Sequence, residues 1–181
     1  MSLHADARGL IAHWAPPDAV QERLREQYLR HLDANPDAMC RSCVPEHLTA
    51  SALVVDPANG HVLLTLHRRL HRWLQTGGHC ESGDVTLAAA ARREAAEESG
   101  MSQLDIDPQP VLLSRHRVPC GPLRPAHHLD VQFVAVAPAG ASPVCSAESY
   151  DVAWFDPRQL PEATDESVRA LVRRALERLG L

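Results

Sequence analysis

Three glutamates, Glu94, Glu97 and Glu98, stand near the end of a stretch, residues 77–100, with the sequence GGHCESGDVTLAAAARREAAEESG. On a helix, residues three and four apart share a face, so the three carboxylates project together. Like charges at this spacing repel one another, and negative charge near a helix C-terminus opposes the helix dipole. Because these two unfavourable effects coincide, we expect a cation to bind the three carboxylates and neutralise their charge. Clustered carboxylates without thiolates suit a hard divalent ion, Mg²⁺ or Mn²⁺.

The residues around the glutamates fit a helix that binds a ligand at its end. We expect this helix to span about 85–99, because the segment is rich in alanine and Gly100 follows at the usual capping position. Gly77 and Gly78 precede it. Paired glycines let the backbone turn tightly and approach a ligand closely, so the carbonyl of Gly78 is a candidate metal ligand.

Two arginines, Arg92 and Arg93, lie just before the carboxylates. Either could hold a glutamate in position or contact a phosphate, and only its geometry would decide. The alternative explanation of RREAAEE is a solvated, charged helix face, which is what most charge runs are. The double glycine upstream and the glycine that ends the helix argue against this alternative.

The remaining segments alternate between strand and helix patterns. Expected helices lie at about 4–14, 19–32 and 165–179, and expected strands at 48–56, 61–66, 72–75, 110–118, 127–137 and 151–155. The first two strands are separated by a turn-forming stretch and therefore predict a hairpin. This mixed order favours an α/β sandwich. We expect residues 1–47 to form a helical extension packed on a core domain of residues 48–181.

The composition is that of an ordinary globular protein, with 45% hydrophobic and 23% charged residues in a chain of 181. A net charge of −5 gives no support for nucleic-acid binding. The five cysteines are scattered and odd in number, which does not indicate a disulfide framework. No apolar run approaches the ~18 residues of a membrane span, so we expect a cytoplasmic protein that binds neither membrane nor nucleic acid.

The stretch from Gly78 to Met101 resembles the Nudix box, G-x5-E-x7-R-E-U-x-E-E-x-G-U, in which U is a bulky apolar residue. The matching positions are Gly78, Arg93, Glu94, Glu97, Glu98, Gly100 and Met101, with a small Ala95 at the first U. The box departs from the pattern at one end. Asp84 stands where the first glutamate belongs, and eight residues instead of seven separate it from Arg93. The extra residue falls where the loop meets the helix and can be absorbed there.

The resemblance implies a Nudix-type α/β/α sandwich with a mixed β-sheet. It also implies metal-dependent hydrolysis of a nucleoside diphosphate linked to another moiety, in which water attacks the pyrophosphate. Mg²⁺ or Mn²⁺ is expected at Glu94, Glu97, Glu98 and the carbonyl of Gly78.

The resemblance also suggests the catalytic residues. Arg93, Glu94 and Glu97 are candidates from the box. A general base must lie within hydrogen-bond reach of the attacking water, and in this family it is a box glutamate or an acid from a later loop. Glu148 is our first choice outside the box and Asp151 the second. Taken individually, each is explained equally well as an ordinary solvated acid in a loop.

Residues outside the glutamate cluster are candidates for binding the substrate. Arg68 precedes the box in an Arg- and His-rich segment and could meet phosphates, although a polar strand end explains it equally well. Trp73 could stack on a base, with a core position as the simpler alternative. His79 lies inside the box loop. The loop at residues 119–128 is expected to shape the pocket.

Two other functions are compatible with the same box. Isopentenyl diphosphate isomerases share the fold and use a cysteine and a glutamate for proton transfer. Cys80, which lies inside the box loop, is the candidate cysteine for this alternative. A non-catalytic nucleotide sensor is the second option, although such proteins usually lose box carboxylates. Cys40 and Cys43 with His47 hint weakly at structural zinc. The expected partner is a nucleotide-type small molecule, and a homodimer is compatible with the family.

Overall fold

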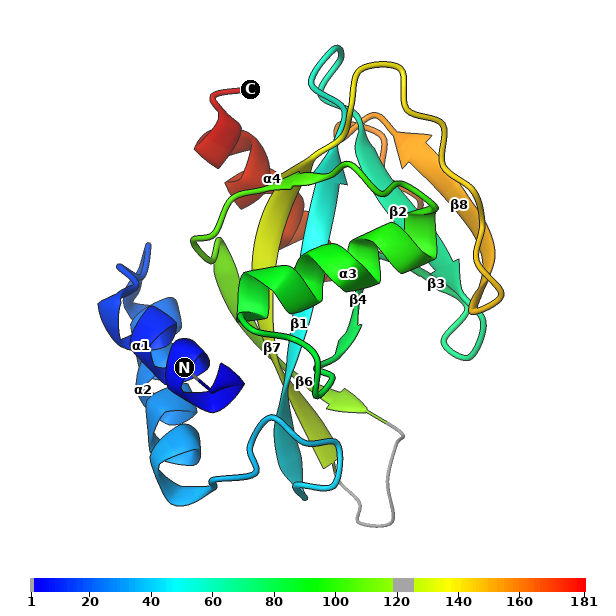
Figure 1. Ribbon diagram of the computed structural model, residues 1–181. Helices are drawn as coiled ribbons and strands as arrows, with labels where there is room; N and C mark the ends of the chain where they lie inside the picture. The colour runs from blue at the N-terminus through cyan, green and yellow to red at the C-terminus, as the bar shows by residue number, and fades with distance from the viewer. Residues whose placement is uncertain (1, 119–125) are drawn as a thin grey trace.

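The computed structural model describes residues 2–118 and 126–181 (Figure 1). Within these ranges the elements follow the order α1 (Leu3–His13), α2 (Ala19–Ala34), β1 (Glu46–Val55), β2 (Val62–His67), β3 (Arg72–Leu74), β4 (Thr76–His79), α3 (Leu87–Ser99), β5 (Asp105–Ile106), β6 (Leu112–Val118), β7 (Ala126–Val136), β8 (Ser149–Phe155) and α4 (Glu166–Leu179). Every expected helix and strand is present, with ends shifted by a few residues. The short strands β4 and β5 were not expected. Residues 119–125 of the expected pocket loop lie outside the described ranges.

The strands form one mixed, eight-stranded sheet within the described ranges, with β1 and β7 at its centre. These two long strands run parallel from the pair Glu46–His127 to the pair Val55–Val136. All other pairings are antiparallel: β2 and β4 lie on β1, β5 and β6 lie on β7, and β3 and β8 lie on β2. This arrangement confirms the predicted α/β fold with a mixed sheet.

The predicted hairpin of β1 and β2 forms only next to its turn. The two strands pair at Val54–Leu63 and Val55–Val62, and the earlier part of β1 pairs with β4 instead. Gly77 makes this second pairing possible, because a Cβ atom on it would lie 2.3 Å from the Cβ of Ser51. The long β1 strand therefore brings the start of the box loop into the sheet.

Alternate side chains of β1 enter two hydrophobic clusters on opposite faces of the sheet. Leu48, Ala50 and Ala52 pack in the cluster that contains the alanines of α3, and Leu53 and Val55 pack in the cluster that contains the apolar side of α4. Figure 1 shows α3 across one face of the sheet and α4 behind the other, so the sheet is the middle layer of a sandwich. No helix within the described ranges is long and apolar enough to cross a membrane.

The N-terminal helices pack on the α3 side of the sheet, beside β6 (Figure 1). Buried polar side chains join them to the sheet backbone. The hydroxyl of Tyr28 lies 2.9 Å from the carbonyl oxygen of Ser114 and 3.0 Å from that of Asp130. The amide of Gln21 donates to the carbonyl of Leu113 and accepts from its N–H. These bonds satisfy backbone groups of β6 and β7 and fix the two helices against the core.

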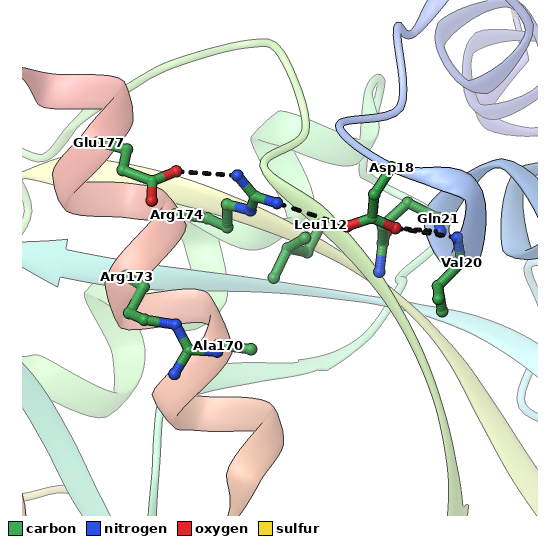
Figure 2. Close-up of a pocket in the computed structure, with 8 residues that line it drawn as sticks. All are labelled: Asp18, Val20, Gln21, Leu112, Ala170, Arg173, Arg174 and Glu177. Carbon is green, nitrogen blue, oxygen red and sulfur yellow. Dashed lines mark hydrogen bonds and ion pairs between the residues drawn. The ribbon is translucent and has the colours of Figure 1, made fainter.

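Figure 2 shows a groove of about 390 Å³ between the start of α2 and α4. Its lining includes Arg174, which is paired with Asp18 at 3.4 Å and with Glu177 at 2.9 Å. The charge of Arg174 is thus already neutralised by acidic side chains. Asp18 also caps α2. No residue of the glutamate cluster lines this groove. The groove therefore lies where the N-terminal helices meet α4, and none of the candidate site residues lines it.

Candidate active site

Helix α3 presents the glutamates at a well-defined end. Its N-cap Thr86 accepts a hydrogen bond from the N–H of Ala89, and Gly100 ends it with φ of 72°, a left-handed conformation that favours glycine. The helix starts at Leu87, two residues later than expected. Four of its alanines, Ala88, Ala90, Ala91 and Ala95, are buried in the core. On the last turns, Glu94 lies against β4 and Glu98 against β2.

Glu98 is the most buried of the three glutamates, with 9% of its surface exposed. The hydroxyl of Thr65 on β2 donates to its Oε2 at 3.3 Å. Burial, followed by the negative charge of Glu94, raises the pKa of Glu98 to about 8. A pKa this high means that the negative charge of Glu98 is buried without a nearby positive charge. A divalent cation would supply that positive charge.

Glu94 lies directly against the backbone of Gly78. A Cβ atom on Gly78 would come within 2.6–2.7 Å of the carboxylate atoms of Glu94, so a side chain at this position would displace that carboxylate. Burial also raises the pKa of Glu94, and the charges of Glu97 and Glu148 add to the effect. The carboxylates of Glu94 and Glu98 are thus packed against the glycine-containing end of β4.

Arg93 ties the box loop to the helix. Its Nε and Nη2 donate to the two oxygens of Asp84 at 3.1 and 3.0 Å, and Nη2 also donates to the carbonyl of His79 at 3.0 Å. Nη1 donates to Glu94 at 3.0 Å and to Glu97 at 3.2 Å. Burial favours the neutral form of Asp84, but the hydrogen bonds from Arg93 and from the N–H of Glu81, together with the charge of Arg93, outweigh it and hold the pKa of Asp84 below its usual value. Of the two arginines, Arg93 is therefore the one that positions carboxylates.

The match to known proteins agrees with this arrangement. The family model for the NUDIX domain matches residues 45–180. The chain belongs to the NUDIX domain family. The predicted Nudix hydrolase class is confirmed with it.

Solved structures of other Nudix proteins share the fold. An Ap4A hydrolase from C. elegans, as a binary complex, has 18% identity and a TM-score of 0.61 over 74% of this chain and 97% of that chain. The dihydroneopterin triphosphate pyrophosphohydrolase of E. coli has 17% identity and a TM-score of 0.60 over 72% and 95%. The NUDIX domain of Shewanella oneidensis NrtR, complexed with ADP ribose, has 21% identity and a TM-score of 0.55 over 73% and 87%. No curated protein sequence matches the chain significantly.

The unusual start of this Nudix box has a structural explanation. Asp84 lies in the loop before α3 and binds Arg93 through both oxygens, so the shorter acid still reaches the arginine. The additional residue lies before Leu87, where the helix begins, and therefore leaves the register of the later glutamates unchanged. The oxygens of Asp84 are committed to Arg93 and to the N–H of Glu81.

Two further acids that the sequence suggested differ in their relation to the box. Glu148 is exposed just before β8, and its charge helps to raise the pKa values of both Glu94 and Glu98. It is therefore near the buried carboxylates of the Nudix box. Asp151 is exposed, and its Oδ1 accepts from the N–H of Val152. Glu97 is also open to solvent, with 59% of its side chain exposed.

The three candidate substrate-binding residues are not gathered in one place. Arg68 donates to the carbonyl of Ser149, the residue after Glu148, at 3.0 Å and lies over the ring of Tyr150. Trp73 packs edge-on against Phe155 in the hydrophobic cluster below α4, which fits the core alternative better than base stacking. The side chain of His79 points to the sheet face opposite Glu94, because Gly78 before it faces α3.

Sequence reasoning missed a group of histidines around His79. His47 and His128 lie beside it on neighbouring strands, with ring centroids 5.1 and 4.9 Å from that of His79. Burial lowers the pKa of His79 to about 4 and that of His128 to about 3. Polar residues alternate along both strands, as His47-x-Thr49-x-Ser51 and as His128-x-Asp130-x-Gln132, and this period of two was the available signal.

The weak suggestion of zinc at the CxxC segment finds no support in the described part of the chain. Cys40 is exposed, Cys43 is buried, and neither belongs to a cluster of potential metal ligands there. Burial raises the pKa of Cys43 to about 11, which disfavours the thiolate that a metal requires. His47, the third member of that suggestion, faces two histidines instead.

Proposed function

We propose that this Nudix domain hydrolyses a nucleoside diphosphate linked to another moiety, using Mg²⁺ or Mn²⁺. One observation carries the proposal: the carboxylates of Glu94 and Glu98, one helical turn apart, are largely shielded from solvent, and that of Glu94 lies directly against the backbone of Gly78 on β4. A diphosphate is itself strongly anionic, so such a site suits it only when cations lie between the two.

The donor set supports a hard divalent ion. Carboxylate and carbonyl oxygens are the ligands that Mg²⁺ and Mn²⁺ prefer, and Glu94, Glu98 and the carbonyl of Gly78 would supply them, with Glu97 at the solvent side. The pKa values of Glu94 and Glu98 support the same conclusion. Burial raises both, although Arg93 pairs with Glu94, and Glu98 has no basic partner among the described residues. When bound, the cation neutralises charge on the pyrophosphate and lowers the pKa of the attacking water.

The residues of the chain then divide the remaining work. Arg93 orients Glu94 and Glu97 and holds the box loop through Asp84 and the His79 carbonyl. Glu148 is the proposed general base that takes the proton of the attacking water, because it is an exposed acid near both buried carboxylates. Arg68 is the proposed contact for a substrate phosphate, and its hydrogen bond to the carbonyl of Ser149, the residue after Glu148, supports this role.

The substrate class rests on similarity. The Ap4A hydrolase, the dihydroneopterin triphosphate pyrophosphohydrolase and the domain bound to ADP ribose are named for compounds that contain phosphoric anhydride bonds. We propose that this chain acts on the same bond type in a nucleotide-type small molecule. The four described cysteines are free, which suits the reducing cytoplasm where such nucleotides occur. We propose that the two helices within residues 1–47 form an extension to the domain.

The test is an activity screen with a matched pair of variants. Protein with Mg²⁺ or Mn²⁺ is incubated with ADP-ribose, dinucleoside polyphosphates and nucleoside triphosphates, and the phosphate-containing products are measured. We expect metal-dependent cleavage that Glu98→Gln abolishes and that Glu162→Gln, an exposed glutamate outside the box, leaves unchanged. Glu148→Gln should lower kcat by about 10²–10⁴ with little change in KM.

Two outcomes would count against hydrolysis. Absence of turnover with intact Mn²⁺ binding would favour the sensor alternative. Conversion of isopentenyl diphosphate without release of phosphate would favour the isomerase alternative. The structure does not favour the isomerase alternative, which would use Cys80. Burial raises the pKa of the Cys80 thiol to about 12, and the side chain packs against the core.

A further inference from the structure

Three histidines from three neighbouring strands meet on the sheet face opposite α3. His47 of β1 pairs directly with His128 of β7, and His79 of β4 pairs with Thr49, two residues further along β1. Residues two apart in a strand share a face, so the pairing places all three side chains on the same side. One nitrogen from each ring lies within 4.8 Å of the other two.

Each of two of these histidines has one ring nitrogen without a hydrogen-bond partner in the described structure. Nε2 of His47 and Nε2 of His79 are both buried and have no hydrogen-bond partner. An unsatisfied buried polar atom destabilises the folded protein. Two such atoms in neighbouring rings therefore suggest a ligand that would satisfy both.

The second nitrogen of His47 indicates which kind of ligand this is. Nδ1 of His47 lies 3.1 Å from the carbonyl oxygen of Cys43, so that Nδ1–H can donate to it. With the proton on Nδ1, Nε2 of His47 carries a lone pair directed away from the loop. Histidines that bind metals usually donate their other N–H to a carbonyl or carboxylate in this manner, which fixes the tautomer and the ring orientation.

We propose that His47, His79 and His128 bind one Zn²⁺ ion through three imidazole nitrogens, with the fourth position of a tetrahedron open to water or a small anion. Zinc binds imidazole nitrogen at about 2.0–2.1 Å, which puts the nitrogens of one site about 3.3 Å apart. Small rotations of the side chains bring nitrogens within 4.8 Å of one another to that spacing. Imidazole suits zinc, whereas Mg²⁺ prefers oxygen, so this site and the carboxylates of the Nudix box select different ions.

Two neighbouring side chains sharpen the proposal. His116 pairs with His128 on β6, with ring centroids 5.5 Å apart, but it does not belong to the group of three converging ligands. Burial is the main reason that the pKa values of all three histidines are lowered, and the positive charge of Arg41 adds to the effect. Because this charge opposes a bound cation, removal of Arg41 should strengthen zinc binding.

The position of the ion gives it a structural role. It would cross-link β4 to β1 and β7 at the residue that follows Gly78. The backbone of Gly78 contacts Glu94, so the cross-link would hold the start of the Nudix box in place. The inference does not depend on the hydrolytic activity, and zinc binding is measured without any substrate.

The experiment uses the full chain without an affinity tag. Protein is stripped with a chelator and dialysed against Zn²⁺ in the presence of excess Mg²⁺, which occupies the carboxylates, and bound zinc is counted by elemental analysis. We expect one Zn²⁺ per chain and a rise in Tm on binding. His47→Gln and His79→Gln should each weaken binding by at least 10-fold, His116→Gln should not, and Arg41→Gln should strengthen it several-fold. Circular dichroism of each zinc-free variant establishes that it is folded.

Replacement of zinc by Co²⁺ identifies the ligands independently. The strong visible absorption of four-coordinate cobalt, without a thiolate-to-cobalt band in the near ultraviolet, is the expected spectrum. A thiolate band would overturn the proposal by moving the ion to the cysteines. Equal zinc binding by the folded His79→Gln variant, or no binding above one-tenth of an ion per chain, would also overturn it and leave the three rings as a packed, metal-free cluster.

Discussion

Glu98→Gln should make the metal-free protein more stable, and increasingly so as the pH rises. The pKa of Glu98 is raised from 4.5 to about 8 by burial and by the charge of Glu94. A carboxyl group with a raised pKa in the folded state favours folding while it is protonated. Its contribution is therefore intact below pH 4.5 and is lost as the pH rises towards 8. From this shift, wild-type protein should lose about 1 kcal/mol at pH 5 and about 3 kcal/mol at pH 7 through Glu98.

Chemical denaturation between pH 4.5 and 8.5, with a chelator present, measures this difference. Other groups titrate over the same range, so the relevant quantity is the free energy of unfolding of Glu98→Gln minus that of wild type. We expect it to increase by about 2 kcal/mol from pH 5 to pH 7, whereas the same difference for the exposed Glu162→Gln should stay flat. Mn²⁺ should stabilise wild type and reverse the order of the two proteins. A flat difference for Glu98→Gln would refute the claim that its carboxylate is buried without a positive partner.

The remaining predictions address the neighbouring residues. Gly78→Ala should weaken Mn²⁺ binding by 10-fold or more, measured by titration calorimetry, because its Cβ would displace a carboxylate now 2.6 Å away, while Gly83→Ala, with nothing within 4 Å, should bind normally. Arg93→Gln should lower the free energy of unfolding by about 2–3 kcal/mol because it leaves buried acids unpaired, and the exposed Arg92→Gln should change it by less than about 0.5 kcal/mol. Equal effects at the two arginines would contradict the proposed anchor. Tyr28→Phe should cost about 1 kcal/mol in a denaturant titration, because the hydroxyl serves two buried carbonyls.

The helix of the Nudix box could be predicted in detail because its information is local. A helical period of 3.6 residues places Glu94 and Glu98 on one face whatever surrounds them, and Gly100 marks the end of the helix. The expected and observed starts of this helix differ by only two residues. The family pattern then supplied the roles of these positions, and the match to the NUDIX domain over residues 45–180 confirms the family.

Pairing partners could not be predicted with the same success. The apolar runs around residues 48–56 and 61–66 predict a hairpin, but β1 uses β2 only at its last two residues and gives the preceding stretch to β4. The reason lies in Gly77 of β4, which lets the two backbones approach where a side chain would collide with Ser51. A propensity for strand says nothing about which of several strands will be the neighbour.

The sequence by itself determined the family, the carboxylate-lined helix and the order of the elements, because each depends on residues close together in the chain. Only the tertiary structure decided which arginine anchors the box, how far the pKa of Glu98 is raised, and that His47, His79 and His128 come together. These features depend on burial and on the register between distant strands. A shift of register by one residue would turn a histidine to the other face of the sheet, and only the packing of the whole domain fixes that register.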